Sequence, residues 1–235
     1  MIAKNLFRSA LHEHAEPAQR VLGVSKLPPD SDELASLLTA DPMPEVRAAA
    51  AMRCTNVAAL AAAWETEADP VVRTALAAAL GPMLAETQHS DVAAAFLESA
   101  GCTDAIRLDV VRHAPDADRR RAAIAALRDE GALIEGALGA EHAETRMAAA
   151  ERVHTPEGLR KLADAARNKD HGVSRLARKR IDALADRAGQ ASEADAILAQ
   201  LEALATTPGP ILTAVIELNK RWQALDIGAD ALPNP

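Results

Sequence analysis

Aromatic side chains are almost absent from this 235-residue chain: they make up 2% of it, with two Phe, two Trp and no Tyr. Hydrophobic residues nevertheless account for 49%, so a core must be built from Ala, Leu, Val and Ile. Strands favour aromatic and β-branched residues, whereas Ala and Leu favour helices. The scarcity of aromatics therefore argues against a β-sandwich or β-barrel and predicts an all-α fold.

Cysteine is also scarce, and Cys54 and Cys102 lie in alanine-rich stretches without the spacing of a metal or redox motif. A single disulfide is one interpretation; two buried thiols in a reducing cytoplasm is the one we favour. The chain has no uncharged apolar run of eighteen residues, and its first residues lack the apolar segment and cleavage site of a signal peptide. We therefore expect a cytoplasmic protein without membrane contact.

Positive charge is unevenly distributed along a chain whose formal net charge is −8. Residues 28–104 contain twelve acidic side chains against three arginines, which leaves −9, whereas residues 152–187 contain ten basic against five acidic side chains, which leaves +5. The net negative charge disfavours binding of nucleic acid or an anionic membrane by the whole surface. The later segment is the place where a polyanion or an acidic protein would bind.

A sequence motif with proline three residues before arginine recurs in the first third of the chain. EPAQRVLGV, MPEVRAAAA and DPVVRTALA place Arg20, Arg47 and Arg73 at spacings of 27 and 26 residues. Proline suits the first turn of a helix, where its missing N–H is not needed, and this spacing accommodates two short helices and two turns. Further copies carry Arg107, Arg146 and Arg175. Five or six helical hairpins are predicted.

The middle of the chain breaks the regular spacing. The arginine-rich stretch 116–129 begins only a few residues after the copy that carries Arg107, and its arginines include Arg120, thirteen residues further on. Either the helix order slips here, or this stretch is a partner helix that carries arginines.

The ends of the chain differ from the repeats. Ser192 and Asp195 stand at N-cap and capping-box positions before an apolar stripe, which predicts a new helix that starts at Ser192 and pairs with a second helix over 211–225. The predicted organisation is an N-terminal capping helix over 1–15, a repeat region over 16–187, a longer helical hairpin over 188–227 and a disordered tail over 228–235.

The stretches that begin at Met43, Ala143 and His171 resemble the HEAT-like repeat family. This resemblance covers roughly residues 16–187 and implies a right-handed α-solenoid of short helical hairpins, an architecture used mostly by protein-interaction scaffolds. A narrower resemblance, carried by the run from Arg146 and by the segments 201–205 and 218–225, is to the N-terminal part of bacterial proteins with the DUF349 domain. The function of that family is not established.

Two sets of basic residues are candidates for a role. A set that recurs in every repeat is expected to stack repeats, each arginine bonding a helix-terminal carbonyl or a carboxylate of the next repeat, although recognition of a carboxylate or phosphate along one surface is the alternative. These stacking arginines are Arg20, Arg47, Arg73, Arg107, Arg146 and Arg175. The second set is a candidate binding face within 152–187. It comprises Arg160, Lys161, Arg167, Arg175, Arg178, Lys179 and Arg180.

We find no catalytic residue, cofactor motif or metal ligand set in the sequence. His12 and His14, spaced i and i+2, point to different faces of a helix. The sequence therefore predicts a non-enzymatic scaffold that binds an unidentified protein partner. The alternatives are a nucleic-acid-binding protein or a relative of HEAT-like alkyl-base DNA glycosylases acting through 152–187, although aromatic stacking partners are missing there. HEAT-like chromophore lyases share only the repeat. Trp222 is either a docking anchor or, as its spacing favours, part of the hairpin seam.

Overall fold

A computed structural model describes residues 11–86, 90–206 and 208–225. These residues form helices and turns without a strand, which confirms the predicted all-α class. The elements are η1 (Leu11–Glu13), α1 (Pro17–Val24), α2 (Asp32–Ala40), α3 (Pro44–Arg53), α4 (Val57–Thr66), α5 (Pro70–Ala85), α6 (Ser90–Glu98), α7 (Asp104–His113), α8 (Ala117–Ala126), α9 (Glu130–Gly139), α10 (Ala143–Glu151), α11 (Pro156–Ala166), α12 (His171–Thr206) and α13 (Leu212–Gln223). The predicted capping helix lies mostly, and the tail over 228–235 wholly, outside the described residues; residues 11–13 form a short 3-10 turn.

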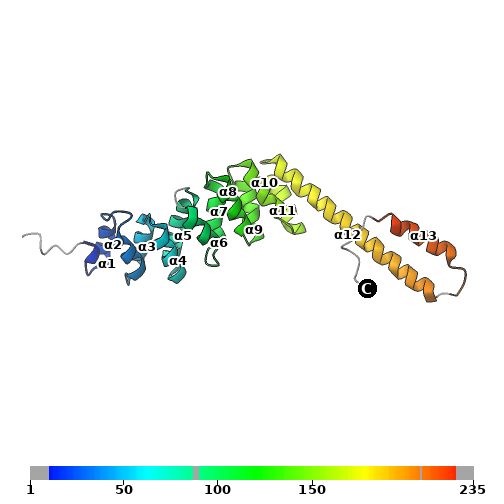
Figure 1. The fold of residues 1–235 in the computed structure, drawn as a ribbon, viewed down its shortest axis with the longest axis horizontal. Helices are drawn as coiled ribbons and strands as arrows, with labels where there is room; N and C mark the ends of the chain where they lie inside the picture. The colour runs from blue at the N-terminus through cyan, green and yellow to red at the C-terminus, as the bar shows by residue number, and fades with distance from the viewer. Residues whose placement is uncertain (1–10, 87–89, 207, 226–235) are drawn as a thin grey trace, which may run out of the picture.

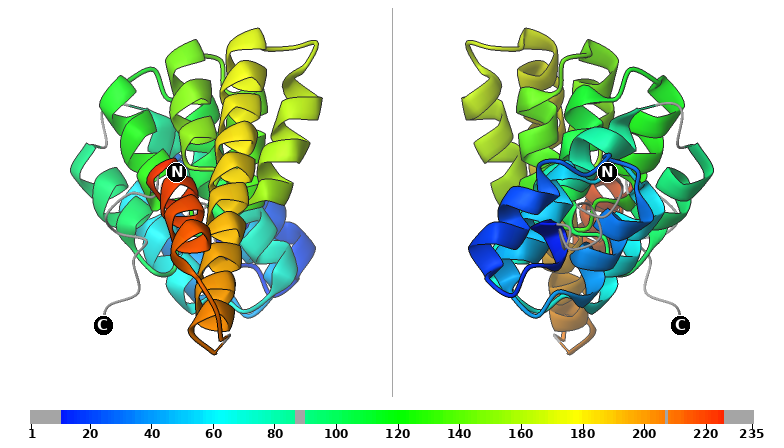
Figure 2. Two further views of the ribbon diagram at one scale, coloured as in Figure 1. Left: turned by 90° about the vertical axis from the view of Figure 1, so that its right-hand side faces the viewer. Right: turned by 90° about the vertical axis from the view of Figure 1, so that its left-hand side faces the viewer.

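Alternate helices are neighbours along the molecule. The odd-numbered helices from α1 to α11 contact one another in succession, and the even-numbered helices from α2 to α12 do the same. The result is two layers of short helices that follow the long axis of an elongated molecule (Figure 1). Viewed along that axis, the short helices overlap as a stack (Figure 2).

Consecutive helices also pair across the two layers, and the pairing changes register at α6. Before α6 the pairs are α2 with α3 and α4 with α5; after it they are α7 with α8, α9 with α10, and α11 with α12. Helix α6 contacts α4, α5 and α8 and is the extra helix between the two series. The helix order therefore slips, as the first interpretation of the stretch 116–129 proposed, and α8 lies in the layer of the partner helices and carries arginines, as the second proposed.

Helix starts follow the sequence signals. Pro17, Pro44 and Pro70 occupy the first position of their helices, as predicted. Helix α2 begins after Ser31, whose hydroxyl accepts a hydrogen bond from the amide of Leu34, the N-cap interaction that satisfies one of the unpaired amides of the first turn.

The core lies between the layers and is built from small aliphatic residues. Ala50, Ala149 and many leucines are fully buried, and the buried aromatic residues in the described part of the chain are Trp64 and Phe96. Cys54 and Cys102 are buried free thiols. Burial raises the pKa of Cys102 to about 11, so this thiol stays protonated and unreactive at neutral pH.

Helix α12 is continuous over 36 residues, so the predicted helix start at Ser192 is wrong. The boundary predicted between the repeat region and the hairpin, at 187/188, lies inside this helix. Since no proline interrupts residues 171–206, the helix simply continues through Ser192. Its first part packs against α10 and α11, and its last part against α13. Between them residues 185–192, here named the spacer, are exposed or, at Gln190, half-buried. No helix in the described residues is long and apolar enough to span a membrane.

Candidate functional site

Six arginines share one position, the fourth residue of a helix. They are Arg20 in α1, Arg47 in α3, Arg73 in α5, Arg107 in α7, Arg120 in α8 and Arg146 in α10. In each case the guanidinium donates hydrogen bonds to backbone carbonyls at or just after the end of the preceding helical segment. Carbonyls at helix ends lack intrahelical partners, so each arginine fastens one helix start to the helix end before it.

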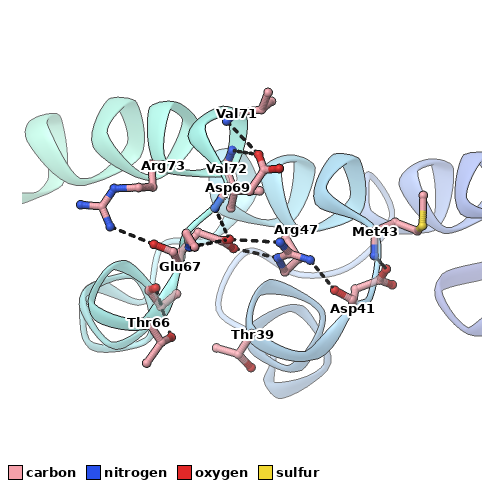
Figure 3. A network of polar contacts seen from close by, with 12 residues as sticks. Thr39, Asp41, Met43, Arg47, Thr66, Glu67, Asp69, Val71, Val72 and Arg73 are labelled. Atoms are coloured by element: carbon pink, nitrogen blue, oxygen red, sulfur yellow. Dashed lines mark hydrogen bonds and ion pairs between the residues drawn. The ribbon is translucent and has the colours of Figure 1, made fainter.

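Arg47 shows the full arrangement (Figure 3). Its Nη1 donates to the carbonyl oxygen of Asp41 at 2.8 Å. Its Nε and Nη2 donate to the two carboxylate oxygens of Glu67 at 2.7 and 3.0 Å. Such a bidentate pair fixes direction as well as distance, and it joins α3 to the segment that follows α4.

The carboxylates continue the connection to the next helix. Glu67 accepts hydrogen bonds from the backbone amides of Ala68 and Asp69, and its carbonyl accepts one from Arg73 at 2.9 Å (Figure 3). Arg20 pairs in the same way with Asp41 at 2.6 Å. The first three repeats are thus linked by an alternating series of arginines and carboxylates, here named the first arginine ladder.

A second arginine ladder begins after the register change, on the even layer. Arg120 donates to the carbonyls of Ala114 and Pro115 and to the hydroxyl of Thr145, and it pairs with Glu144. Arg146 repeats the pattern. It donates to the carbonyls of Ala140 and Glu141 in the segment before α10 and forms an ion pair with Asp170 at 2.7 Å.

Arg107 lies between the two ladders and is 1% exposed. It donates to the carbonyls of Leu97 and Ser99 and pairs with Asp104 in its own helix. Asp104 in turn accepts hydrogen bonds from the amides of Arg128 and Asp129, directly before α9. Arg107 and Asp104 therefore carry the connection across the extra helix.

Arg175 does not belong to this set. The fourth residue of α12 is Ser174, which is buried and donates its hydroxyl hydrogen bond to the carbonyl of Ala163 at 3.0 Å. Arg175 comes one residue later, is exposed, and has no hydrogen bond or ion pair to the described residues. Conversely, sequence reasoning missed Arg120 as a stacking residue, although its place four residues after the N-cap Asp116 was a usable signal.

Three carboxyl groups of the two ladders have pKa values below the ordinary values of Asp and Glu. The hydrogen bond from Arg47 holds the pKa of Glu67 down, and that from Arg146 does the same for the pKa of Asp170. Burial alone would raise the pKa of Asp41, but hydrogen bonds from Arg20 and Met43 outweigh it and leave that pKa lowered as well. All three carboxylates are thus stabilised in the ionised form.

This predicts loss of stability in acid. A carboxyl group whose pKa is lower in the folded than in the unfolded chain stabilises the fold above its unfolded value, and the contribution disappears as pH falls through the folded value. The free energy of unfolding should therefore decrease as the pH falls below the ordinary pKa values of these groups, which are 4.5 for Glu67 and 3.8 for Asp41 and Asp170. Urea titrations between neutral pH and about pH 3 measure it. In Glu67→Gln this acid dependence should be smaller; an unchanged dependence would contradict the assignment.

The predicted binding face separates into paired and unpaired cations. Lys161 pairs with Glu157 at 2.7 Å and Arg167 with Asp164 at 2.9 Å. Arg180 donates to the carbonyl of Glu151 at 2.6 Å and contacts the ring of His154, so it acts in packing α12 onto α10. The four others make no side-chain hydrogen bond or ion pair with the described residues. They are Arg160 on α11, and Arg175, Arg178 and Lys179 on α12.

The unpaired cations of α12 form one cluster. Arg178 and Lys179 follow Arg175 by three and four residues, so all three lie on one side of the helix, and all are exposed. We name Arg175, Arg178 and Lys179 the α12 cluster. Arg160 belongs to α11 in the other layer and is not part of it.

Other kinds of site are not supported by the described residues. They contain no group of three or more side chains suited to hold a metal ion. An open hollow between α9 and α11 is lined by Glu130, Thr155 and Arg160, but the Glu130 carboxylate is engaged by the backbone amides of His154 and Thr155. Comparison with known proteins gives no match to a family model, a curated protein or a solved structure.

Proposed function

We propose that this protein is a right-handed, HEAT-like α-solenoid that acts as a non-enzymatic scaffold and binds an acidic segment of a protein partner through the α12 cluster. The two helix layers, the Pro-x-x-Arg phrases and the recurrence of an arginine at the fourth helix position support the repeat architecture. In such an architecture each helix pair contacts only its neighbours, so the row is elongated. An elongated row offers a large surface to other proteins.

The observation that carries the binding proposal is the contrast between two classes of cation. Six arginines are bound to the chain's own carbonyls, whereas Arg175, Arg178 and Lys179 are exposed without a partner. Like charges at i and i+3 or i+4 weaken a helix by a few tenths of a kcal/mol. Among the described residues the cluster thus forms no ion pair that stabilises the fold, and an acidic ligand would relieve its repulsion.

An acidic peptide segment fits this cluster better than a nucleic acid does. The same side of α12 continues with Asp182, which follows Arg178 by four residues and limits the length of the positive strip. A duplex needs phosphate contacts along a longer basic surface. The described residues also give the cluster no stacking platform, because Trp64 and Phe96 are buried and Trp222 lies in the hairpin at the far end of α12.

Charge reversal tests the proposal. The variant Arg175→Glu, Arg178→Glu, Lys179→Glu should lower the affinity for a labelled oligoglutamate peptide at low salt by about tenfold or more, because it removes the attraction and adds repulsion. Fluorescence anisotropy measures this affinity. The matched control reverses three exposed cations that are already paired, namely Arg121, Lys161 and Arg167.

The two variants carry the same change in net charge and therefore separate local from overall electrostatics. Equal losses in both would contradict a site at the α12 cluster. Tighter binding of a DNA duplex than of the peptide, with the same dependence on the α12 cluster, would favour nucleic-acid binding in place of the scaffold function.

A further inference from the structure

The hairpin at the end of the molecule is held clear of the helix row. The spacer has eight residues, so it adds about 12 Å of single helix between the two parts. Ala177 is buried against the row and Ile197 is buried in the hairpin. Ile197 follows Ala177 by twenty positions, which rotates the helix by about 200° and puts α13 on the opposite side of α12 from the row. Figure 1 shows the hairpin projecting from the row. The described part of the row therefore does not cover the hairpin.

One broad side of this hairpin is apolar. A groove of about 240 Å³ between α12 and α13 is lined by Ile197, Leu198, Leu201, Val215, Leu218 and Trp222, with Asn219 as a polar lining residue. Leu198 is 43% exposed. On α13, Ile216 is 49% and Leu212 is 72% exposed. We name this side the apolar hairpin face. Two helices alone cannot bury such a face, since a helix buries its apolar stripe only against other elements.

The opposite side of the hairpin is of mixed character. It is lined by Gln200, Glu217 and Arg221 together with Ala203, Leu204, Ala214 and Leu218, and Arg221 bridges the two helices through an ion pair with Glu193 at 2.7 Å. An ion pair therefore lies on this side of the hairpin, whereas no charged side chain among the described residues lines the groove of the apolar hairpin face.

We propose that the apolar hairpin face binds the same face of a second copy of this chain, so that two hairpins form an antiparallel four-helix bundle about a two-fold axis parallel to the helices. Such bundles bury apolar stripes of neighbouring antiparallel helices in a shared core. Two-fold association of one chain uses the same patch on both copies, and an uncharged face of two helices' width is complementary to itself.

Charges at the rim of the face select this arrangement. Asp195 and Glu202 are three residues before and four after Leu198, so they edge the face along α12, and Lys220 follows Ile216 by four residues and edges it along α13. An axis parallel to the helices places α12 against α13 of the partner, which sets an acidic rim against a basic one. A two-fold axis perpendicular to the helices would set α12 against α12, acid against acid.

The level of these charges along the hairpin also matches. The ion pair between Arg221 and Glu193 shows which residues of α13 and α12 lie at the same height. Lys220 and Asp195 are each within two residues of that pair. A rotation about an axis parallel to the helices preserves height, so Asp195 meets Lys220 of the partner subunit. Among the described residues of one chain, the ion pair of Lys220 is a long contact of 3.7 Å to Glu217.

Light scattering coupled to gel filtration of the full chain tests the proposal. The expected mass is twice the 24.7 kDa of one chain. Leu198→Glu should raise the dimer dissociation constant by about a hundredfold or more, because it places a charge in the centre of the buried face. Gln200→Glu, two residues away on the opposite side, is the matched control and should leave the dimer intact. A wild-type monomer at roughly 0.1 mM protein, or a dimer unaffected by Leu198→Glu, would overturn the proposal.

A charge exchange tests the arrangement. Asp195→Lys alone and Lys220→Asp alone should each weaken the dimer several-fold. The double variant should recover most of the affinity, because it restores the ion pair between the two copies with the two charges exchanged. Additive losses in the double variant would overturn the two-fold arrangement. None of these variants alters the α12 cluster, so failure here is distinguishable from failure of peptide binding.

Discussion

Replacing Arg120 by alanine should lower the free energy of unfolding by about 3–4 kcal/mol. Arg120 is 3% exposed, and it bonds the carbonyls of Ala114 and Pro115, the hydroxyl of Thr145 and the carboxylate of Glu144. Removing it leaves the buried acceptors of Ala114 and Thr145 without this donor, and each unsatisfied buried acceptor costs about 1–3 kcal/mol. Urea denaturation followed by circular dichroism measures the change.

The neighbouring Arg121 supplies a matched control. Its side chain is 69% exposed and pairs only with Asp118 in the same helix. Because exposed ion pairs contribute little to stability, Arg121→Ala should change the free energy of unfolding by less than about 0.5 kcal/mol. If the two variants were equally stable, the ladder would not be what holds α8 to the helix before it and to α10.

The recurrence of an arginine at the fourth helix position is the part of this fold that sequence captured best. An interaction that depends on repeated geometry must recur with the repeat, so Arg20, Arg47 and Arg73 marked their helices correctly. The same logic failed at α12, where Ser174 occupies the position and Arg175 faces solvent. The spacing between the arginines cannot reveal that one of them is displaced by one residue, because the repeats differ in length by more than one residue.

Pairing between distant segments was the main thing that sequence could not supply. Arg180 belongs to the densest run of positive charge, yet it bonds the carbonyl of Glu151, 29 residues earlier. Lys161 pairs with Glu157 in its own helix, and Arg167, the C-cap residue of α11, pairs with Asp164 in that helix. Net charge along the chain located the basic segment, but only three-dimensional contacts reduced seven candidate cations to the three of the α12 cluster and one on α11.

The C-terminal hairpin shows a second limit. Its apolar periodicity identified two amphipathic helices, and Trp222 does line the groove beside Leu218. Periodicity cannot tell whether an apolar stripe is covered within the chain. It also suggested a helix start at Ser192, because N-cap residues are common at starts but do not by themselves interrupt a helix that has no proline. The continuous α12 is what separates the hairpin from the row and leaves its apolar side open.

Replacing Trp64 by alanine is expected to have the other large effect, a loss of about 3–5 kcal/mol. Trp64 is 4% exposed, its indole N–H donates to the carbonyl of Gly101 at 2.7 Å, and the guanidinium carbon of Arg73 lies 4.0 Å from the ring centroid. It thus fixes α4 to the segment between α6 and α7 and supports the first arginine ladder. Thermal and urea unfolding measure the loss.

Two further variants divide this effect into its parts. Trp64→Phe keeps most of the apolar volume and should cost only about 1–2 kcal/mol, chiefly the lost hydrogen bond. Trp222→Ala removes the other tryptophan, which is half-buried in the hairpin. Because stability in a repeat row depends on neighbouring elements and the spacer separates hairpin from row, this variant should leave the unfolding of the row unchanged. A loss equal to that of Trp64→Ala would mean that hairpin and row unfold as one unit, and that the spacer transmits stability between them.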